Sequence, residues 1–496
     1  MIDSAEIIRK NYKNNRRLVV VSNRVPSISV PGYTRQTRKQ TVGGLVSALC
    51  PVLEERGGLW FGWNGNTTPY RRNNHVRQQR LGSFDVVTID LSENEVAEFY
   101  IEFCNRTLWP LFHGFIEFVR SNQDKYQIYQ RINRRFALTL APLLRTNDLV
   151  WIHDYHLFPL GAELRALGWN GPLGFFLHIP FPPGDIFRIR PWLRPILEDL
   201  TVYDLLGFHT HQYAHNFVEA ATREIGGSFD GGIYRNGTAS VKVGTYPIGI
   251  DPERFKDWSS HTFALRFGQR LRRMVQGRRI VLGVDRLDYT KGIPERFLAF
   301  ERLLELNPSW RGRVLMIQIS APSRTQVAEY RAQRNEVDRL VNKINKRFST
   351  ADWTPIHLFH RPYSQEKLAA LYREADVCLV TPLRDGMNLV GKEFVASQTG
   401  DPGVLVLSKF CGAAEEMKEA IRINPHDTDR TTEAIERALE MPLEERKSRM
   451  NALVERVYSH TAKQWADGFL ADLIYSNLRQ HRLVTPRRSF PKAVPA

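Results

Sequence analysis

The sequence predicts an α/β protein with two doubly wound domains that face each other across a cleft. Strand-like and helix-like segments alternate along the chain, which is typical of parallel sheets covered by helices. The chain has 496 residues, 42% of them apolar, so it can bury a large core and is long enough for two or three domains. Segment 246–251, punctuated by Pro and Gly, separates two series of strands and marks the joint between the domains.

The first domain is predicted over residues 17–250, after an N-terminal extension at 1–16. Ser92 and Glu95 have the spacing of a capping box ahead of an amphipathic helix. A further helix is expected over 127–144. The strand candidates are short apolar runs at 17–22, 85–90, 148–153 and 173–178.

Beyond the second domain, Trp465, Phe469 and Leu473 recur at intervals of four, which indicates an amphipathic helix. We expect this terminal helix, at 460–478, to pack back toward the first domain. The Pro-rich basic tail at 479–496 is expected to be disordered. The second domain itself is predicted over 251–459, with strands at 279–284, 314–319, 356–359, 377–380 and 404–407 and helices at 294–306 and 364–374.

The formal net charge of +16 raises the question of a polyanionic partner. Basic residues are dense at the two ends of the chain, but no RRM, KH or zinc-finger pattern accompanies them. We therefore interpret the ends as solvated tails on an enzyme that handles anionic substrates, and we predict no nucleic-acid partner.

Several features favour a cytoplasmic protein. Residues 1–13 contain no apolar run of signal-peptide kind, and no run of about 18 uncharged apolar residues occurs, so no membrane partner is predicted. The four cysteines lie far apart without a CxxC spacing, and we expect reduced thiols. The oligomeric state is left open, with a homo-oligomer as an alternative.

Metal ligation is an alternative for two segments that contain several histidines, 153–178 and 209–215, and for the Asp427 and Asp429 pair. Neither histidine segment has the tight i, i+4 spacing of a helical metal motif. Asp427 and Asp429 are in position to cap a following helix. We predict no metal and no cofactor.

The most informative segment is 379–394. A β-branched strand is followed by the turn pair Asp385 and Gly386, and then by a helix from Leu389. Backbone N–H groups and the dipole of such a helix favour a phosphate, while Asp385 and Glu393 can accept hydrogen bonds from sugar hydroxyls. This combination suits a nucleotide-sugar.

Arg286 and Lys291 lie in a loop between a strand that ends at Val284 and a helix. At the carboxyl edge of a parallel sheet, two such cations could clamp a diphosphate. Taken alone they read more readily as surface charges. However, this loop and the segment around Asp385 should open on one crevice, which favours a site.

In the first half, Asp154 and His178 each lie at the end of a predicted strand, and Gly43 and Gly44 open a helix. A glycine pair lets the backbone approach a phosphate, although such pairs are common.

Aromatic residues are also concentrated in this half. The faces of Trp60, Trp63, Tyr100 and Trp109 suit the C–H faces of pyranose rings, although burial in the core is the commoner fate of such side chains.

Together, these motifs resemble the trehalose-6-phosphate synthases, which are retaining glucosyltransferases of family 20 with two Rossmann-like domains (GT-B). The similarity extends from about Arg17 to Leu473. The matching motifs occur in the family's order, at 22–24, 43–44, 59–63, 108–110, 151–156, 175–182, 204–208, 246–250, 286–292 and 381–393.

The resemblance implies transfer of glucose from a nucleotide-glucose, usually UDP-glucose, to glucose 6-phosphate with retention of configuration. On the donor side, Arg286 and Lys291 should hold the diphosphate and Glu393 the ribose hydroxyls. The donor glucose and its phosphate should be held by Asp385 and the backbone of Gly386, Met387, Asn388 and Leu389, with Gly43 and Gly44 closing over the donor.

On the acceptor side, the resemblance assigns the 6-phosphate to Arg24, Tyr100 and Arg324. Trp60 and Trp109 should form the sugar wall. The residues expected to act nearest the chemistry are Asp154 on acceptor hydroxyls, His178 beside the donor sugar, Arg286, Lys291 and Asp385.

Several questions stay open at this point. A related enzyme could use a different phosphorylated acceptor, as glucosylglycerol-phosphate synthases do, and a silent sugar-phosphate sensor is a further alternative. The sequence leaves open whether the donor base is uracil, guanine or adenine, and what the long basic loop at 26–40 does.

Overall fold

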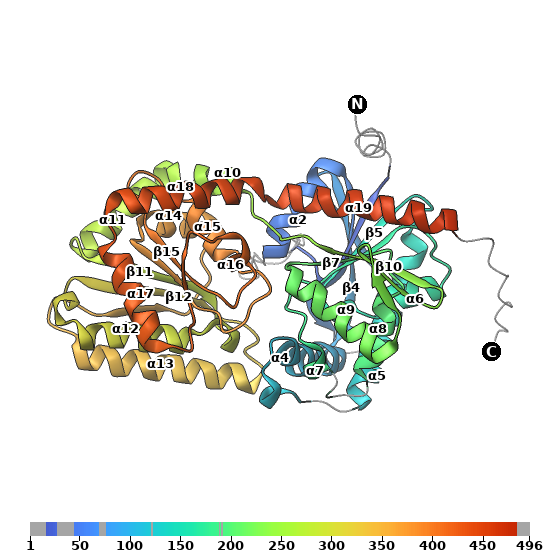
Figure 1. Cartoon of the computed structure of the whole chain (residues 1–496), viewed down its shortest axis with the longest axis horizontal. Helices are drawn as coiled ribbons and strands as arrows, with labels where there is room; N and C mark the ends of the chain where they lie inside the picture. The colour runs from blue at the N-terminus through green and yellow to red at the C-terminus, as the bar shows by residue number, and fades with distance from the viewer. Residues whose placement is uncertain are drawn as a thin grey trace.

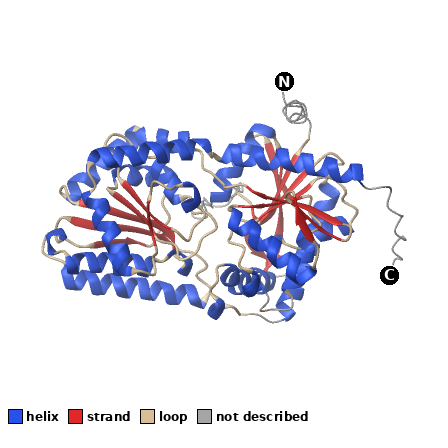
Figure 2. Cartoon of the chain, in the orientation of Figure 1, coloured by secondary structure: helices blue, strands red, loops and turns tan. Residues whose placement is uncertain are grey.

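The computed structural model describes residues 16–26, 44–68, 76–120, 123–187, 189 and 192–483. These residues form two α/β domains side by side, each built on a twisted sheet with helices on its faces (Figures 1 and 2). The predictions for the N-terminal extension, the loop at 26–40, Gly43 and most of the C-terminal tail lie outside the described residues. None of the described helices is both long and apolar enough to cross a membrane.

The sheet of the first domain has ten strands in the order β3-β4-β2-β1-β5-β6-β7-β10-β9-β8. From β4 to β10 neighbouring strands are parallel, and antiparallel pairs occur only at the edges. The strands are β1 (Leu18–Arg24), β2 (Gly58–Thr68), β3 (Arg77–Leu81), β4 (Phe84–Ser92), β5 (Leu149–His153), β6 (Leu173–Phe176), β7 (Leu205–Phe208), β8 (Ser228–Asp230), β9 (Ile233–Asn236) and β10 (Ala239–Thr245).

Four of these strands match segments that the sequence predicts. The edge strands β3 and β8 were not anticipated, because their side chains are almost all exposed and show no apolar alternation. Their backbones are ordered instead by antiparallel pairing with β4 and β9.

The helices of the first domain cover both faces of its sheet (Figure 1). The expected capping box is present, since Ser92 Oγ accepts from Glu95 N at 3.2 Å and Ser92 N donates to Glu95 Oε2 at 2.9 Å. The helix that follows it is π-helical over Val96–Leu108. The α-helices are α2 (Gly44–Arg56), α3 (Glu93–Glu95), α4 (Trp109–Phe112), α5 (Gln123–Leu140), α6 (Leu160–Ala166), α7 (Gly184–Phe187), α8 (Leu193–Leu200) and α9 (His211–Ile225).

The second sheet is parallel throughout, in the order β13-β12-β11-β14-β15-β16. Helices cover both of its faces, so β14 and β15 are buried at every position and read as continuous apolar runs. Its strands are β11 (Arg279–Arg286), β12 (Val314–Ala321), β13 (Ile356–Phe359), β14 (Val377–Val380), β15 (Val404–Ser408) and β16 (Ile421–Ile423).

The helices from residue 252 onward are α10 (Pro252–Ser260), α11 (Thr262–Val275), α12 (Ile293–Leu306), α13 (Ala328–Phe348), α14 (Gln365–Glu374), α15 (Val390–Ala396), α16 (Ala413–Glu416), α17 (Thr428–Glu440), α18 (Leu443–Ser459) and α19 (Ala462–Leu483). Asp427 caps α17, with its Oδ1 accepting from Arg430 N at 3.0 Å, as the capping interpretation predicts.

The chain passes between the domains twice, at 246–251 and again before α19. The two passages touch: Ala462 N donates to Ile250 O at 2.8 Å, and a Cβ on Gly249 would lie 1.9 Å from His460 O. Helix α19 then runs along the first domain (Figure 1), where Trp465 and Phe469 pack on Trp151 with ring centroids 4.8 and 4.6 Å apart. This helix continues to Leu483, past the end that the sequence predicts.

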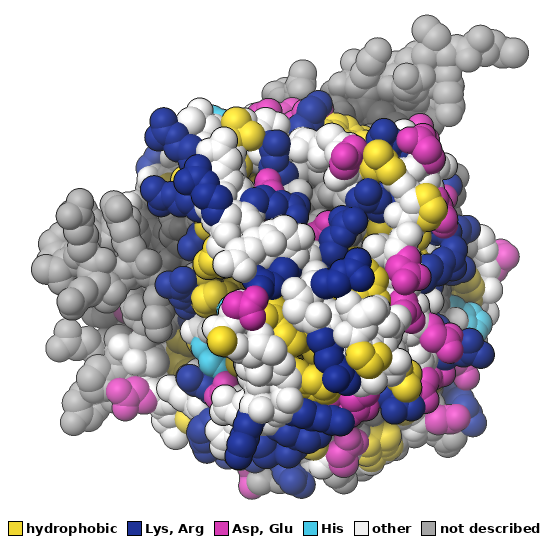
Figure 3. Space-filling model, turned by 90° about the vertical axis from the view of Figure 1, so that its left-hand side faces the viewer, with side chains coloured by type: hydrophobic (Ala, Val, Ile, Leu, Met, Phe, Trp, Pro, Cys, Tyr) yellow, Lys and Arg dark blue, Asp and Glu magenta, His cyan; other side chains and the backbone are white. Residues whose placement is uncertain are grey.

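Charged side chains of both signs are interspersed on the outer end of the second domain (Figure 3). At the amino end of β11, Arg278 pairs with Asp352 at 2.9 Å and Arg279 with Asp376 at 2.6 Å. Part of the positive charge of the chain is therefore neutralised locally by ion pairs.

Candidate functional site

The predicted site residues converge where the carboxyl ends of the two sheets meet. In the second domain, the loops after β11, β12 and β14 carry Lys291, Arg324 and Asp385. Opposite them lie the ends of β1, β5 and β6 of the first domain. This placement follows from parallel topology, because all strands of such a sheet deliver their following loops to one edge.

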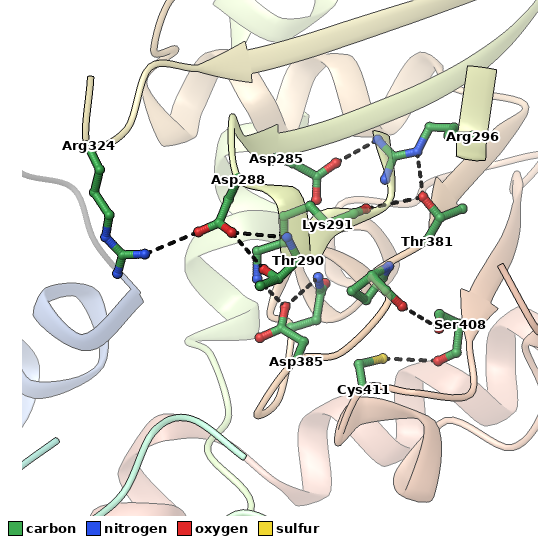
Figure 4. Close-up of polar contacts among 12 residues, drawn as sticks. Asp285, Asp288, Thr290, Lys291, Arg296, Arg324, Thr381, Asp385, Ser408 and Cys411 are labelled. Atoms are coloured by element: carbon green, nitrogen blue, oxygen red, sulfur yellow. Dashed lines mark hydrogen bonds and ion pairs between the residues drawn. The ribbon is translucent and has the colours of Figure 1, made fainter. Parts of the chain in front are cut away.

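Lys291 and Asp385 form a close ion pair, with Nζ to Oδ2 at 2.6 Å (Figure 4). Their side chains are only 8% and 15% exposed. Burial would raise the pKa of Asp385, but Lys291 and Arg286 hold it below its ordinary value. A cation and a carboxylate are therefore held ready side by side, as the sequence predicts for these two loops.

The turn that carries Lys291 is fixed from within. Asp288 Oδ1 accepts from Thr290 N at 3.1 Å and from Thr290 Oγ1 at 2.9 Å. Burial opposes the ionisation of Asp288, but Arg324 and Arg286 bring its pKa down to about 2. Gly292 has φ of 59° and a Cβ there would lie 2.1 Å from Thr381 O, so the turn can pack against the β14 loop only with glycine.

A buried arginine forms hydrogen bonds with the ends of both strands that lead into the Lys291 and Asp385 loops. Arg296 lies in α12 and donates to Asp285 at 2.6 Å and to Thr381 Oγ1 at 3.1 Å (Figure 4). Because Asp285 belongs to β11 and Thr381 follows β14, this side chain fixes the spacing of the two strand ends that present Lys291 and Asp385.

The Asp385 loop also lies directly against the first domain. Tyr213 OH donates to Asp385 O at 3.0 Å. A Cβ on Gly386 would lie 2.1 Å from His178 O, and one on Gly44 would lie 2.8 Å from Leu389 Cδ1. The first turn of α2 and the β14 loop are thus neighbours. A larger residue at Gly386 would meet the backbone of His178 and push the domains apart, whereas one at Gly44 would meet only the end of the Leu389 side chain.

Glu393 lies half-buried in the first turn of α15, where its Oε2 accepts from Tyr372 OH at 2.9 Å. Burial raises the pKa of this carboxyl to about 7. Asn388 has φ of 74° and donates to Asp385 Oδ2 at 3.3 Å. Met387 is 3% exposed, so its backbone rather than its side chain is available to a ligand.

Arg24, Trp63 and Tyr100 form a second cluster in the first domain. The guanidinium of Arg24 lies 4.7 Å from the Trp63 ring centroid, and the Trp63 and Tyr100 rings meet edge to face at 5.7 Å. Gly65, with φ of 92°, makes room for Arg24, since a Cβ there would overlap the guanidinium. Tyr100 also stacks on His156 at 5.9 Å.

Trp60 is not part of this cluster, which corrects the sequence-based assignment. Its side chain is 0% exposed within the core of the sheet, and Nε1 donates to Ser22 Oγ at 2.8 Å. Side chains alternate across a strand, so Trp60 and Trp63, three positions apart, point to opposite faces of β2. Trp63 is the tryptophan that lies beside Arg24.

Arg324 joins the two domains at this junction. Its guanidinium carbon lies 3.9 Å from the ring centroid of Trp109, and its Nη2 donates to Tyr155 OH at 3.1 Å. Within its own domain, Nη1 contacts Asp288 Oδ2 at 3.4 Å (Figure 4). Arg286 lies farther from the same indole ring, at 5.6 Å. Trp109 is therefore the point where cations of the second domain reach an aromatic surface of the first.

Asp154 and His178 follow β5 and β6. Asp154 has φ of 76° and its Oδ1 accepts from His178 N at 3.3 Å. Burial raises the pKa of Asp154 to about 6, although backbone N–H groups, Arg324 and Arg286 oppose the shift. Burial also lowers the pKa of His178, whose Nε2 is 3.0 Å from His153 Nδ1. No group of three or more potential metal ligands occurs among the described residues.

Some residues at this junction were not anticipated. Tyr213 and Tyr155 are fixed by contacts across the domains, and Tyr372 by a contact with α15, so local sequence gives no signal for them. Strand alternation could have shown that Trp60 and Trp63 lie on opposite faces of β2, but not which of the two lies beside Arg24.

Comparison with known proteins assigns the chain to a family. Residues 16–475 match the model of glycosyltransferase family 20. A trehalose-6-phosphate synthase of Sinorhizobium fredii is 40% identical, covering 93% of this chain and 99% of that protein. The UDP-forming α,α-trehalose-phosphate synthase of Schizosaccharomyces pombe is 38% identical, covering 99% and 96%.

Solved structures agree over the same length. A UDP-forming α,α-trehalose-phosphate synthase from Burkholderia xenovorans, in complex with glucose-6-phosphate, has a TM-score of 0.86 at 37% identity and covers 93% of this chain and 100% of that chain. An E. coli structure bound with UDP-2-fluoro glucose has a TM-score of 0.86 at 37% identity and covers 92% and 98%. With both its sequence and its two-domain fold matched almost end to end, this chain is a member of glycosyltransferase family 20.

Proposed function

We propose that the protein is an α,α-trehalose-6-phosphate synthase, which transfers glucose from UDP-glucose to glucose 6-phosphate with retention of configuration. Relatives of this name cover nearly the whole chain, and solved neighbours hold glucose-6-phosphate or a UDP-glucose analogue. The observation that carries the proposal is the junction between the domains. The second domain supplies the Lys291–Asp385 pair, and its Arg324 crosses to Trp109 of the first domain, which also carries the cluster of Arg24, Trp63 and Tyr100.

On the donor side, Arg286 and Lys291 would hold the diphosphate. Lys291 would exchange part of its contact with Asp385 for phosphate oxygens, and Asp385 would turn to the sugar. The backbone of Gly386, Met387, Asn388 and Leu389 would bind the donor glucose and its phosphate, and Glu393 the ribose hydroxyls. Gly44, at the start of α2, is in position to close over the donor, since it lies against Leu389.

On the acceptor side, Arg24, Tyr100 and Arg324 would bind the 6-phosphate, because each cation lies over an aromatic ring of the first domain, Arg24 over Trp63 and Arg324 over Trp109. Trp63 and Trp109 would form the sugar wall, with Trp63 in place of Trp60. Asp154, with His178 beside it, would accept from sugar hydroxyls near the reacting centre.

This arrangement supports a same-face displacement. As the bond from the sugar carbon to the diphosphate breaks, negative charge grows on the leaving group, and Arg286 and Lys291 stabilise it there. The departing phosphate oxygen would take the proton of the acceptor hydroxyl as the new glycosidic bond forms on the same face. Contacts between the domains, such as Tyr213 with Asp385 and Arg324 with Tyr155, would help to exclude water once substrates are bound and so limit hydrolysis of the donor.

An acceptor other than glucose 6-phosphate is the second candidate, as in glucosylglycerol-phosphate synthases. Arg24, Tyr100, Trp109 and Arg324 are all present and gathered at the junction, which favours a hexose phosphate.

We also propose a cytoplasmic location, because all four cysteines are free thiols. Self-association stays a prediction.

The test is a product assay with purified protein. UDP-, GDP- and ADP-glucose are each incubated with glucose 6-phosphate, fructose 6-phosphate or glycerol 3-phosphate, and products are identified by mass spectrometry and by the anomeric couplings in NMR spectra. We expect an α,α-linked disaccharide phosphate from UDP-glucose and glucose 6-phosphate. Preferential glucosylation of glycerol 3-phosphate would reject the proposal in favour of the second candidate.

A further inference from the structure

His113 follows α4 directly and is held by the backbone of that helix. Its Nδ1 lies 2.8 Å from Trp109 O. A carbonyl oxygen can only accept, so Nδ1 carries the proton and Nε2 has a free lone pair. Burial, assisted by Lys291, lowers the pKa of His113 to about 3. The imidazole is therefore neutral at ordinary pH, and its Nε2 is a hydrogen-bond acceptor.

That acceptor has no partner. His113 is 2% exposed, and its Nε2 is buried without a hydrogen bond among the described residues. The adjacent indole of Trp109 has an unpaired donor, since its Nε1 is buried without a hydrogen-bond partner among the described residues. The two rings are neighbours, with centroids 4.2 Å apart. Unpaired buried groups of this kind are costly, and a ligand that pairs them gains binding free energy.

These two unpaired groups lie close to residues of both proposed substrate sites. Arg324 lies over Trp109 at 3.9 Å on the acceptor side. Just beyond His113, the rings of Phe115 and Phe118 pack on Tyr289 at 5.1 and 5.0 Å, and Tyr289 belongs to the turn that ends in Lys291. The charges that act on His113 are accordingly those of Lys291, Asp288 and Asp385.

The chemistry of the junction explains why a neutral acceptor is useful here. Arg24, Arg286, Lys291 and Arg324 can only donate hydrogen bonds, whereas a sugar hydroxyl also needs an acceptor for its own proton. A further carboxylate could accept the proton of the sugar hydroxyl, but it would add negative charge close to the departing diphosphate. A neutral imidazole accepts the proton without that repulsion.

We propose that His113 is an acceptor-binding residue: one hydroxyl of the bound hexose phosphate donates to His113 Nε2 and accepts from Trp109 Nε1. This inference rests on the proposed function and deepens it, since it assigns a hydroxyl-selective contact to the hexose site. Because the contact sits beside Trp109, it discriminates hexose phosphates that present this hydroxyl from those that lack it.

The variant His113→Phe keeps a ring beside Trp109 and removes the acceptor. With glucose 6-phosphate we expect kcat/KM to fall about tenfold to a hundredfold, the usual cost of leaving a buried group unpaired, mainly through the acceptor KM. Hydrolysis of UDP-glucose without acceptor should fall much less than the acceptor-dependent rate.

Deoxy acceptors provide the matched control. Wild type and His113→Phe are compared with the 2-, 3- and 4-deoxy forms of glucose 6-phosphate. With one of these deoxy acceptors, the wild-type enzyme should already show the fall in kcat/KM. With that same acceptor, His113→Phe should lower kcat/KM by less than about twofold further, because the missing hydroxyl and the missing imidazole belong to the same contact. An equal loss with every acceptor, or a parallel loss of donor hydrolysis, would overturn the inference and assign His113 to the packing of Lys291.

Calorimetry separates failure of this inference from failure of the proposed function. Binding of glucose 6-phosphate to the UDP-loaded wild type and variant needs no turnover. If wild type binds the hexose phosphate but forms no disaccharide, the proposed function fails while the His113 contact is still measured. Should His113→Phe not fold, His113→Gln, which retains an acceptor oxygen, is expected to recover part of the affinity.

Discussion

Replacing Lys291 by Met separates its two roles, in stability and in turnover. The buried ion pair with Asp385, at 2.6 Å, loses its cation, while a side chain of similar length fills the space. Breaking a fully buried pair from one side costs about 3–5 kcal/mol. Asp385 is 15% exposed and keeps the hydrogen bond from Asn388 at 3.3 Å, so we expect the lower end, about 3 kcal/mol of unfolding free energy.

Turnover should fall for a different reason. Lys291 is proposed to face the oxygens on which charge grows as the diphosphate leaves, and removing one such donor typically lowers kcat by about 10²–10³. Initial-rate kinetics of UDP release should show this loss with little change in the acceptor KM.

The double variant Lys291→Met with Asp385→Asn tests the reasoning. It removes the unpaired charge, so stability measured by urea unfolding should return to within about 1 kcal/mol of wild type, while kcat stays low.

The pH dependence of stability gives a second check. In wild type Asp385 has a lowered pKa, and its contribution to stability is lost as the pH falls. In Lys291→Met burial dominates, so the destabilisation should shrink toward low pH. A wild-type kcat in Lys291→Met, or in the double variant, would refute the role of Lys291 in turnover.

Three further predictions follow from the junction. Arg324→Lys keeps the charge but loses the planar contact with Trp109, so the KM for glucose 6-phosphate should rise about tenfold or more with an unchanged KM for UDP-glucose; equal changes in both would contradict the assignment. Trp60→Ala and Trp63→Ala should both lower the unfolding free energy by about 3–5 kcal/mol, since their side chains are 0% and 2% exposed, but only Trp63→Ala should also raise the acceptor KM; a KM effect from Trp60 would restore the original assignment. The raised pKa of Glu393, about 7, should make stability decline between pH 4.5 and 7 and level off above, and Glu393→Gln should remove this slope in melting curves; an unchanged slope would show that the carboxyl titrates normally.

Local sequence was sufficient for features that depend on neighbouring residues. The capping box at Ser92, the cap at Asp427 and the four-residue periodicity of α19 appear in the structure because each rests on contacts within a turn or two of chain. The predicted meeting of Lys291 and Asp385 was also found, because both follow strands of one parallel sheet and such loops share an edge.

Features that depend on contacts formed only in the folded protein could not be predicted from the sequence. The orphan acceptor of His113 exists because a backbone carbonyl fixes the tautomer and the surrounding structure buries the other nitrogen. The edge strands β3 and β8 form by pairing rather than by their own apolar pattern.

The sequence by itself determined the α/β class, the two series of strands, the family resemblance and most of the candidate residues, since these follow from periodicity and from motifs at strand ends. Only the tertiary structure decided which tryptophan of β2 lies beside Arg24 and how Arg324 reaches Trp109. The physical reason is that covered sheets bury both faces of a strand alike. The pattern of apolar residues therefore cannot tell which face meets the substrate. Contacts between separate elements settle it, such as Arg24 with Trp63 and Arg324 with Trp109.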